Sequence, residues 1–460
     1  MASELQTYSL SDLGKIVTGK TPPAKIKTAY ADGHGTLFVT PRDMDGRRWI
    51  DSTERYLSGE GLLSVQRNQI PSGSIAVSCI GSDMGKAVLV KDNSVTNQQI
   101  NSLLVDETRF NPLYVYYVLS TKQQYLKDIA GGSATPILNK TDFGKVTIQL
   151  PLKVVQDEIA NLLDAFDSKI ELNRQINQTL EQMAQTLFNS WFVDFDPVMD
   201  NALDAGNPIP DELQHRAEAR KAVRESEGFK PLPDNVRQLF PDAFEESELG
   251  WVPKGWEVVE IKAHCSKIQN GGTPKRSEKE YWDNGTIPWL TSGEVRQSMI
   301  TNVENRITEA GLTNSSAKWV PEGSTLVALY GATAGEVSTN AVTLTTNQAV
   351  CALVPKKNYR WLNYLQVRVK TKEMQSKAVG SAQQNISKGL VESLKVISPS
   401  NEILITFNKL SESYFAKAID NNKSIGTLTL LRDTLLPKLI SGELRLDDVE
   451  VAVEQETISA

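Results

Sequence analysis

The sequence predicts a mixed α/β (α+β) protein in which a globular unit followed by a long helix occurs twice. Hydrophobic residues recur at heptad spacing over residues 152–191, and the same pattern returns over residues 403–435. Short turn motifs ahead of each helix also recur at a similar offset, so the internal repeat covers almost the whole chain. Even the polar interruption of the heptads repeats, because Asn173 and Asn421 are 421 − 173 = 248 residues apart.

Two interleaved heptad rows are predicted to form the buried seam of each helix. In the first helix these rows are Leu152, Ile159, Phe166, Asn173, Leu180, Leu187 and Val155, Leu162, Lys169, Ile176, Met183. In the second helix they are Phe407, Tyr414, Asn421, Leu428, Leu435 and Ile403, Leu410, Lys417, Ser424, Leu431. At a rise of about 1.5 Å per residue, the first helix is expected to be roughly 60 Å long. Asn173 and Asn421 are candidates for setting the register of the pairing.

The globular units are identified by repeated turns and by short strand-like runs. Residues 18–22 correspond to 270–274, 71–74 to 321–324, 96–98 to 346–348 and 132–134 to 380–382. Apolar runs at residues 37–40 and 75–78 predict strands. The expected domains are 1–150 (first globular unit), 151–195 (long helix), 196–250 (proline-rich linker with a short helix), 251–398 (second globular unit), 399–446 (second long helix) and 447–460 (acidic tail).

Composition and charge narrow the class of protein. The chain has 460 residues, of which 40% are hydrophobic and 23% charged, as is typical of a globular protein. It has no signal-peptide pattern and no apolar stretch long enough to cross a membrane, so a soluble, cytoplasmic protein is expected. The net charge of −7 is unevenly distributed. Residues 1–150 hold 16 Lys/Arg against 14 Asp/Glu and residues 251–398 hold 18 against 12, whereas residues 151–250 hold 9 against 20.

The motifs assign no catalytic residue, and no cofactor or metal is expected in this chain. The three cysteines and three histidines are scattered, and the adjacent pair His264 and Cys265 favours a structural role over a zinc site. Residues 14–21 satisfy the GxxxxGK[ST] pattern of a phosphate-binding loop. Pro22 and Pro23 follow directly and remove two of the N–H donors that hold phosphate at a helix start. Because the second copy also lacks the lysine, a repeated Gly-x-Thr-Pro turn is the preferred interpretation.

Glycine-flanked polar loops recur in both units, and they carry the side-chain types that bind nucleic acid. Arg, Lys, Gln and Asn read base edges, while Ser, Thr and Lys hold phosphates. A single such loop is usually a solvated turn, but recurrence in both halves favours a binding surface. The candidate DNA-binding residues in the first unit are Lys20, Thr21, Arg42, Ser82, Lys86, Ser133, Thr135, Asn139 and Lys140. Those in the second unit are Thr273, Lys275, Arg276, Thr291, Ser292, Arg296, Thr333, Ser381, Gln383, Gln384, Asn385 and Lys388.

In the order of its motifs, the chain resembles the DNA-specificity (S) subunits of type I restriction-modification enzymes over almost its full length. The residues that carry the resemblance are the two Gly-x-Thr-Pro turns, the two Pro-x-Gly-Ser turns, and residues 156–160, 187–197, 248–256 and 435–443. The resemblance implies two target-recognition domains, each of which reads one half of a bipartite DNA sequence. It also implies that the two helices form an antiparallel coiled coil that holds these domains apart.

The resemblance further implies partner subunits. Two copies of an adenine-methylating modification subunit would dock on the helical regions, and motor-endonuclease restriction subunits would complete the enzyme. S-adenosylmethionine, ATP and Mg would belong to those partners. An antiparallel helix pair gives the internal repeat a pseudo-two-fold axis, and helices of fixed length predict one allowed gap between the half-sites. The net acidity suggests that partners supply much of the phosphate neutralisation.

Two other interpretations remain open beside a non-catalytic DNA-recognition and assembly subunit. A coiled-coil scaffold that binds proteins or glycans is favoured by the net acidity and by the small basic excess of residues 1–150. An ATPase rests only on the pattern at residues 14–21.

Overall fold

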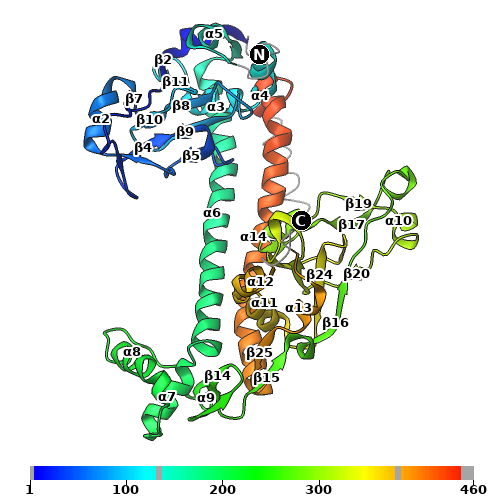
Figure 1. Cartoon of the computed structure of the whole chain (residues 1–460). Helices are drawn as coiled ribbons and strands as arrows, with labels where there is room; N and C mark the ends of the chain where they lie inside the picture. Colours follow the sequence, from blue (N-terminus) through cyan, green and yellow to red (C-terminus); the bar gives the residue numbers. More distant parts are fainter. Residues whose placement is uncertain (1–4, 131–136, 379–384, 447–460) are drawn as a thin grey trace. The chain divides into compact units, whose positions relative to one another are not determined.

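The computed structural model describes residues 5–130, 137–378 and 385–446. The chain divides into two compact units (Figure 1): unit 1 comprises residues 1–170 and 427–460, and unit 2 comprises residues 171–426. Each unit contains one globular domain together with part of the long helices α6 (Lys153–Phe192) and α14 (Asn401–Ser441). The predicted mixed α/β class, with a globular unit and a long helix occurring twice, is therefore confirmed.

Domain 1, which we define as residues 5–150, is built on two five-stranded sheets. The first sheet has the order β2 (Gly14–Thr18), β11 (Ile100–Val105), β8 (Ile75–Ser78), β9 (Ala87–Val90) and β5 (Trp49–Ile50). The second has the order β3 (Tyr30–Ala31), β6 (Tyr56–Leu57), β4 (Thr36–Val39), β10 (Ser94–Thr96) and β7 (Gln69–Ile70). A further antiparallel pair joins β1 (Gln6–Ser9) to β12 (Thr147–Leu150). The helices are α1 (Leu10–Leu13), η1 (Pro41–Asp43), α2 (Gly59–Val65), η2 (Gln66–Asn68), α3 (Pro112–Ser120), α4 (Gln123–Ile129) and α5 (Lys140–Lys145).

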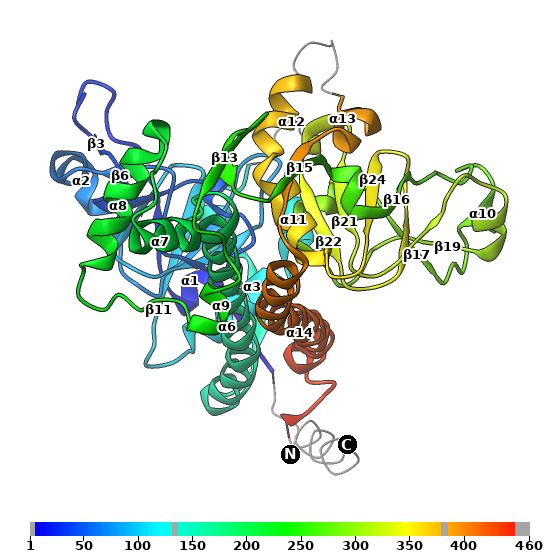
Figure 2. The same cartoon turned by 90° about the horizontal axis from the view of Figure 1, so that it is seen from below.

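Domain 2, residues 257–398, repeats this topology except that its second sheet has four strands and lacks a counterpart of β3. Its first sheet has the order β16 (Cys265–Asn270), β24 (Val350–Pro355), β21 (Thr325–Ala328), β22 (Val337–Asn340) and β18 (Met299–Ile300). Its second sheet has the order β19 (Arg306–Ile307), β17 (Ile287–Leu290), β23 (Leu344–Thr346) and β20 (Trp319–Val320), and β15 (Glu257–Glu260) pairs with β25 (Lys395–Ser398). The helices are η4 (Ile261–His264), η5 (Lys279–Tyr281), η6 (Ser292–Arg296), α10 (Glu309–Thr313), η7 (Gly331–Thr333), α11 (Arg360–Val369), α12 (Thr371–Ala378) and α13 (Lys388–Glu392). Figure 2 shows α11 beside β21 and β22, with α10, β17 and β19 at the end of the domain remote from α14.

The apolar runs of the sequence become buried strands, β8 in the first sheet of domain 1 and β4 in the second. All four residues of β8 are buried, and β4 is buried from Leu37 onward, so the predictions of strands at 37–40 and 75–78 are confirmed. The core of unit 1 extends from this sheet through α3 to both long helices, since Tyr114, Leu163 and Leu439 belong to one buried cluster. In unit 2, Trp361 on α11 stacks on Phe415 of α14 with ring centroids 4.0 Å apart. The first sheet of each domain is thus fixed to the long helices by one continuous core.

The buried face of the long helices differs from the predicted seam in one of its two rows. The row through Asn173 and Asn421 is buried or half-buried, except for Leu152, which is 61% exposed. The other predicted row is wrong, because several of its members are exposed: Lys169, Met183, Leu410, Lys417 and Leu431. The row one residue later is buried or half-buried instead, and it repeats in both helices: Gln156, Leu163, Ile170, Asn177, Ala184, Trp191 and Leu404, Ser411, Ala418, Ile425, Arg432, Leu439. Because this row contains polar and small residues, the pattern of apolar positions in the sequence does not identify it.

Buried amide side chains join α6 to α14 in unit 2. Asn177 Nδ2 donates to Asn422 Oδ1 at 2.8 Å, and Asn177 Oδ1 accepts from Asn421 Nδ2 at 2.8 Å. Asn173 Nδ2 donates to Ser424 Oγ at 3.3 Å. The residue numbers of the partners decrease along α14 as those along α6 increase, so the two helices run antiparallel here. Asn173 and Asn421 both lie in this network as expected, but Asn177, which the predicted seam omits, is the residue that bonds to two partners.

The segment between α6 and domain 2 is more helical than the proline pattern indicates. It forms α7 (Asp196–Ala205), η3 (Asp211–Leu213), α8 (Gln214–Arg224), α9 (Asp234–Arg237) and the hairpin β13 (Phe244–Ser247) and β14 (Gly250–Pro253). Pro197 occupies the first turn of α7, where its missing N–H has no helical partner to lose. Arg220 on α8 binds the buried Asp200 on α7 through two hydrogen bonds, of 2.9 and 2.7 Å. Prolines here start helices as well as separate them.

Burial of His264 makes the stability of unit 2 depend on pH. The ring is 1% exposed and stacks on Tyr359 with centroids 4.3 Å apart. Burial lowers the pKa of His264 to about 4. As the pH falls from about 6.5 to 4, the unfolded chain takes up a proton at this ring and the folded chain does not, so stability is lost on acidification. We expect unit 2 to lose about 2 kcal/mol between pH 7 and pH 5.

Urea unfolding monitored by tryptophan fluorescence at pH 7 and pH 5 measures this loss. His264→Phe keeps an aromatic ring against Tyr359 but cannot titrate, so it should reduce the difference between the two pH values by about 2 kcal/mol. An unchanged pH dependence in this variant would assign the effect to other groups.

No helix in the described part of the chain is long and apolar enough to cross a membrane.

Candidate nucleic-acid interface

The predicted loops gather at one edge of each domain. In domain 1, β2 and β8 both pair antiparallel with β11, so the ends of β2 and β8 lie beside the start of β11. In the second sheet, β4 and β10 run parallel and therefore end together. The turn from Thr96 to Ile100 joins the end of β10 to the start of β11, which brings the two sheet edges together. The equivalent pairings in domain 2 involve β16, β21, β24, β17 and β23.

The Gly-x-Thr-Pro turn packs on the Thr-Asn-Gln turn in both domains. Gly19 approaches so closely that a Cβ would lie 2.3 Å from the Thr96 carbonyl oxygen. The Thr21 hydroxyl donates to Gln98 Oε1 at 2.6 Å. The same contacts in domain 2 join Gly271 to Thr346 and Thr273 to Gln348. Two of the repeated sequence motifs are therefore the two halves of one scaffold, which fixes this edge of the domain.

The structure does not form a phosphate-binding loop at residues 14–21. Residues 14–18 are strand β2, and the chain continues into turns rather than into a helix. The Lys20 N–H donates to the Thr96 carbonyl at 2.8 Å, so it holds the turn instead of facing a phosphate. A nucleotide loop needs free N–H groups at the start of a helix. The motif that was the only basis for the ATPase interpretation is thus a structural turn.

A carboxylate holds the loop after β4. Asp43 Oδ2 accepts from the Thr40 N–H at 2.7 Å and from the Thr40 hydroxyl at 2.8 Å, and Asp43 Oδ1 accepts from the Glu54 N–H at 2.8 Å. In domain 2 the same three bonds connect Glu294 with Thr291 and Glu304. The Thr291 hydroxyl therefore already has a partner inside its own loop. The side chains that face outward from these loops are Arg42 and Arg296.

A glutamine side chain holds the loop after β8. Gln123 Nε2 donates to the Met84 carbonyl at 3.2 Å, and Gly85, at φ +83°, leaves no room for a Cβ beside the Gln123 backbone. Gln375 makes the equivalent bond to the Ala334 carbonyl, also at 3.2 Å. Isolated bridges then join Ile80 to Ile137 and Tyr330 to Asn385. These bridges bring the chain that leads to Asn139, Lys140 and Lys388 to the same edge.

Most predicted residues that the structure describes lie at the surface. Exposed side chains are those of Lys20, Thr21, Arg42, Ser82, Asn139, Lys140, Lys275, Arg276, Arg296 and Asn385, and partly exposed ones are those of Lys86, Thr273, Thr291, Ser292 and Lys388. The prediction for Thr333 needs correction. Its side chain is 6% exposed, because η7 turns it inward, and its hydroxyl donates to the Tyr330 carbonyl at 3.5 Å. Ser133, Thr135, Ser381, Gln383 and Gln384 lie outside the described residues.

Several of the basic candidates pair with nearby carboxylates. Lys86 Nζ lies 2.8 Å from Asp83 Oδ1, and Lys388 Nζ lies 3.1 Å from Glu392 Oε1. Lys275 Nζ lies 2.8 Å from Glu278 Oε1, and this hydrogen bond raises the pKa of Lys275. Exposed pairs of this kind contribute little stability. A DNA phosphate can therefore replace the carboxylate at small energetic cost.

The structure also identifies surface residues that sequence reasoning missed. In domain 1 a pocket of about 420 Å³ at this edge is lined by Thr40, Pro41, Arg42, Glu54, Arg55, Asn97 and Gln99. Arg55, Asn97 and Gln99 are additions to the predicted set. Asn97 belongs to the repeated Thr-Asn-Gln motif, which could have indicated it. Arg55 has no flanking glycine and no matching arginine in the second copy, so the sequence offered no signal for it.

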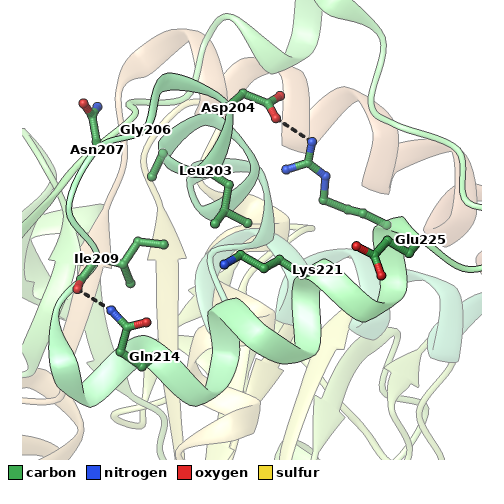
Figure 3. Close-up of a pocket in the computed structure, with 10 residues that line it drawn as sticks. Leu203, Asp204, Gly206, Asn207, Ile209, Gln214, Lys221 and Glu225 are labelled. Atoms are coloured by element: carbon green, nitrogen blue, oxygen red, sulfur yellow. Dashed lines mark hydrogen bonds and ion pairs between the residues drawn. The ribbon is translucent and has the colours of Figure 1, made fainter.

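The described residues offer no obvious catalytic chemistry. Burial raises the pKa of Cys79 to about 11 and that of Cys265 and Cys351 to about 12, so these thiols stay protonated at neutral pH. No group of three or more His, Cys, Asp or Glu among the described residues could hold a metal ion. A pocket of about 620 Å³ is formed mainly by α7 and α8 (Figure 3), but its charges are of both signs. There Arg224 binds Asp204 at 2.5 Å, so one of the pocket's two positive charges is already neutralised.

A family model provides the decisive comparison. The model described as "Type I restriction modification DNA specificity domain" matches residues 2–182 and 253–414. These two ranges contain both globular domains with their repeated edges. The chain belongs to this family. Membership in the specificity-domain family accounts for the internal repeat, because the family's domain occurs in it twice.

Curated relatives from the specificity-domain family align along nearly the whole chain. The specificity subunit of type I restriction enzyme MjaIX from Methanocaldococcus jannaschii is 27% identical over 450 residues, which are 96% of this chain and 93% of that protein. The specificity subunit of type I restriction enzyme HindI from Haemophilus influenzae is 29% identical and covers 96% of this chain and 100% of that protein. The crystal structure of a type I restriction-modification S subunit from M. genitalium has a TM-score of 0.58 at 14% identity and covers 95% of this chain and 96% of that chain. This likeness supports the fold.

Proposed function

We propose that this chain is the sequence-specific DNA-recognition and assembly subunit of a type I restriction-modification complex, without catalytic activity of its own. The observation that carries the proposal is the repeated edge. In both domains the same turns fix the same loops, whereas the side chains that face outward differ, as Arg55 and its structural equivalent Asn305 do. A shared scaffold with different surface chemistry suits two readers of two unlike half-sites.

Each edge would read one half of a bipartite target. Exposed lysines such as Lys20, Lys140 and Lys275 are suited to phosphates, because a point charge on a flexible stem needs no fixed geometry. Arg42, Arg296 and Asn385 carry the planar or paired donors that discriminate base edges in the major groove. The described candidates other than Thr333 make up this proposed surface.

The long helices would set the gap between the two half-sites. α6 is continuous over 40 residues and α14 over 41, and their pairing is fixed in unit 2 by the buried network of Asn177 and Asn421. Helices of fixed length and register allow one separation of the half-sites. We expect a spacer of fixed length, a little over one duplex turn between the centres of the half-sites.

Partner subunits would supply the chemistry. Two modification subunits would dock on the helical regions, which expose apolar side chains that include Leu172 and Met183 on α6 and Ile405 and Leu430 on α14. Restriction subunits would join them to form the endonuclease. S-adenosylmethionine, ATP and Mg would be bound by those partners. The names of the curated relatives, each a specificity subunit of a type I restriction enzyme, support this assignment.

Methylome sequencing of cells that express this chain with its modification subunit tests the proposal. We expect one methylated motif with two unlike halves and a spacer of constant length. The purified complex should also retain DNA that carries this motif more strongly than shuffled DNA, with affinity falling as salt rises. Absence of any sequence preference across the salt range would contradict the proposal and favour a protein-binding or glycan-binding scaffold.

A further inference from the structure

In domain 1 an exposed arginine lies on a pair of aromatic rings. The guanidinium carbon of Arg55 is 5.0 Å from the centroid of the Tyr30 ring and 5.1 Å from that of the Phe38 ring. The two rings meet edge to face, with centroids 5.7 Å apart. Phe38 is fully buried on β4, whereas Tyr30 is 37% exposed. The outer ring therefore forms a platform at the surface, anchored by the inner one.

Domain 2 carries the same arrangement. The guanidinium carbon of Arg276 is 3.9 Å from the Trp282 ring and 5.1 Å from the Trp289 ring. These rings also meet edge to face, with centroids 5.0 Å apart. Trp289 is buried on β17, and its Nε1 donates to the Gly272 carbonyl at 2.9 Å. The platform is thus tied to the Gly-x-Thr-Pro turn of the repeated edge.

The inner rings are equivalent, but the arginines are not. The Phe38 N–H donates to the Arg55 carbonyl at 3.2 Å, and the Trp289 N–H donates to the Asn305 carbonyl at 2.9 Å. Asn305 therefore stands where Arg55 stands in domain 1. Arg276 comes instead from the loop after the Gly-x-Thr-Pro turn. An arginine from a different chain position therefore stacks on the same kind of platform in each domain. This indicates that the stacked arginine itself has a role in both domains and was not merely retained from one ancestral position.

Stacking prepares a guanidinium to read a base. The ring face holds the planar group in one orientation and reduces the entropy lost on binding, while the N–H edge stays available. Arg55 lines the same pocket as Arg42, Asn97 and Gln99, at the edge where the predicted loops meet. Arg276 follows Thr273 by three residues, and the Thr273 hydroxyl bonds Gln348 of the repeated scaffold. Both stacked arginines are therefore placed on the proposed DNA-reading edges.

We propose that Arg55 and Arg276 are specificity-determining residues, each of which reads a guanine through paired N–H donors to its O6 and N7. This inference rests on the proposed function and assigns chemistry to its two reading edges. An arginine that donates two parallel hydrogen bonds matches guanine in the major groove better than any other base. Because the two arginines reach their edges from different chain positions, the guanines should occupy different places in the two half-sites.

Arg55→Lys and Arg276→Lys, each in the complete complex with modification subunits, test the inference. Lysine keeps the charge but loses the planar pair of donors. We expect discrimination at a single guanine position of one half-site to fall roughly 10- to 100-fold, with the other half-site and the salt dependence unchanged. Methylome sequencing measures the base preference at every position. Retention of the full motif by both variants, while the wild-type complex shows a bipartite motif, would overturn this inference and leave the proposed function standing.

Two further variants complete the design. Arg109→Lys is the matched control, since Arg109 stacks on Phe110 at 4.9 Å beyond the far end of β11 from the loops, and it should leave both half-sites unchanged. Arg55→Asn installs the residue that domain 2 carries at the equivalent position, so it is compatible with the fold. It should remove the guanine preference at the same position as Arg55→Lys. A loss of specificity in Arg109→Lys, or different positions affected by the two Arg55 variants, would contradict direct reading. A wild-type complex without any bipartite motif would instead remove the proposed function itself.

Discussion

Asp167→Ala is expected to lower the free energy of unfolding of unit 1 by about 3 kcal/mol. The Asp167 side chain on α6 is 12% exposed, and its Oδ1 accepts from Arg432 Nη1 of α14 at 2.6 Å. Its Oδ2 accepts from the Tyr117 hydroxyl of α3 at 2.7 Å and lies 3.5 Å from Arg48 Nη1. Removing the carboxylate leaves the guanidinium groups of Arg432 and Arg48 with only the more exposed Asp433 and Asp164 as counter-charges. Taking away the buried partner of a largely buried charge is costly.

Native-state hydrogen exchange of α3 measures this effect, with α11 of unit 2 as an internal reference. Asp164→Ala is the matched control. Asp164 is on α6, as Asp167 is, and its carboxylate lies 2.6 Å from Arg48 Nη1. Because the Asp164 side chain is 42% exposed, its loss should lower the free energy of unfolding by less than about 1 kcal/mol. Equal effects of the two substitutions would show that the Asp167 network does not hold domain 1 on the helices.

The two domains are fixed to α6 by networks that share a tyrosine and differ in its partners. Tyr117 and Tyr364 occupy equivalent places on α3 and α11, but Tyr364 accepts from Arg368 Nη1 at 2.9 Å. Arg368 in turn lies 3.2 Å from Glu181 of α6, and Glu181 also accepts from the Ser298 hydroxyl. Buried polar contacts are directional, so they fix the orientation of each domain on its helix more narrowly than apolar packing does. That orientation determines where the proposed reading edge of each domain points relative to the helix segment on which the domain packs.

The sequence predicts those features that depend on local pattern. The apolar run at residues 75–78 is a fully buried strand, and the heptads at Asn173 and Asn421 mark helices that are continuous in the structure. Loop recurrence also located most of the exposed edge, because the same turns must form in both copies. Patterns of this kind are set by backbone geometry and burial, which each short segment encodes for itself.

Features that depend on contacts distant in sequence could not be predicted. The buried row through Gln156, Asn177 and Ala184 is hidden because polar and small residues give no hydrophobic signal, and tertiary hydrogen bonds satisfy the amides. Arg55, directly before β6, contacts Tyr30 on the neighbouring strand β3, and no local motif predicts this contact. Thr333 has the residue type of a phosphate ligand, but only the folded turn shows that its side chain is buried. Orientation and exposure of loop side chains are thus properties of the assembled domain.

Insertion of four residues into both long helices is expected to lengthen the spacer by one or two base pairs and to leave both half-sites unchanged. Four residues add about 6 Å to a helix, and one duplex turn of about 34 Å contains about 10 base pairs. The insertions belong after Gln178 in α6 and after Ile419 in α14, which lie opposite each other because Asn177 bonds Asn421. A pair of seven-residue insertions keeps the heptad phase and should add about three base pairs.

Insertion into α6 alone provides the contrasting case. The Asn177–Asn421 bond and the contact of Phe192 with Phe407, whose ring centroids are 4.8 Å apart, lie on opposite sides of the insertion. With only one helix lengthened, both contacts cannot be kept, and loss of the buried aromatic contact should cost several kcal/mol, on the order of a large-to-small core substitution. We therefore expect methylation of every bipartite target to be lost. Methylome sequencing compares the three designs. Lengthening a helix alters no residue at the proposed reading edges. A double insertion that changes the bases read in either half-site would therefore contradict the role of the helices as a spacer.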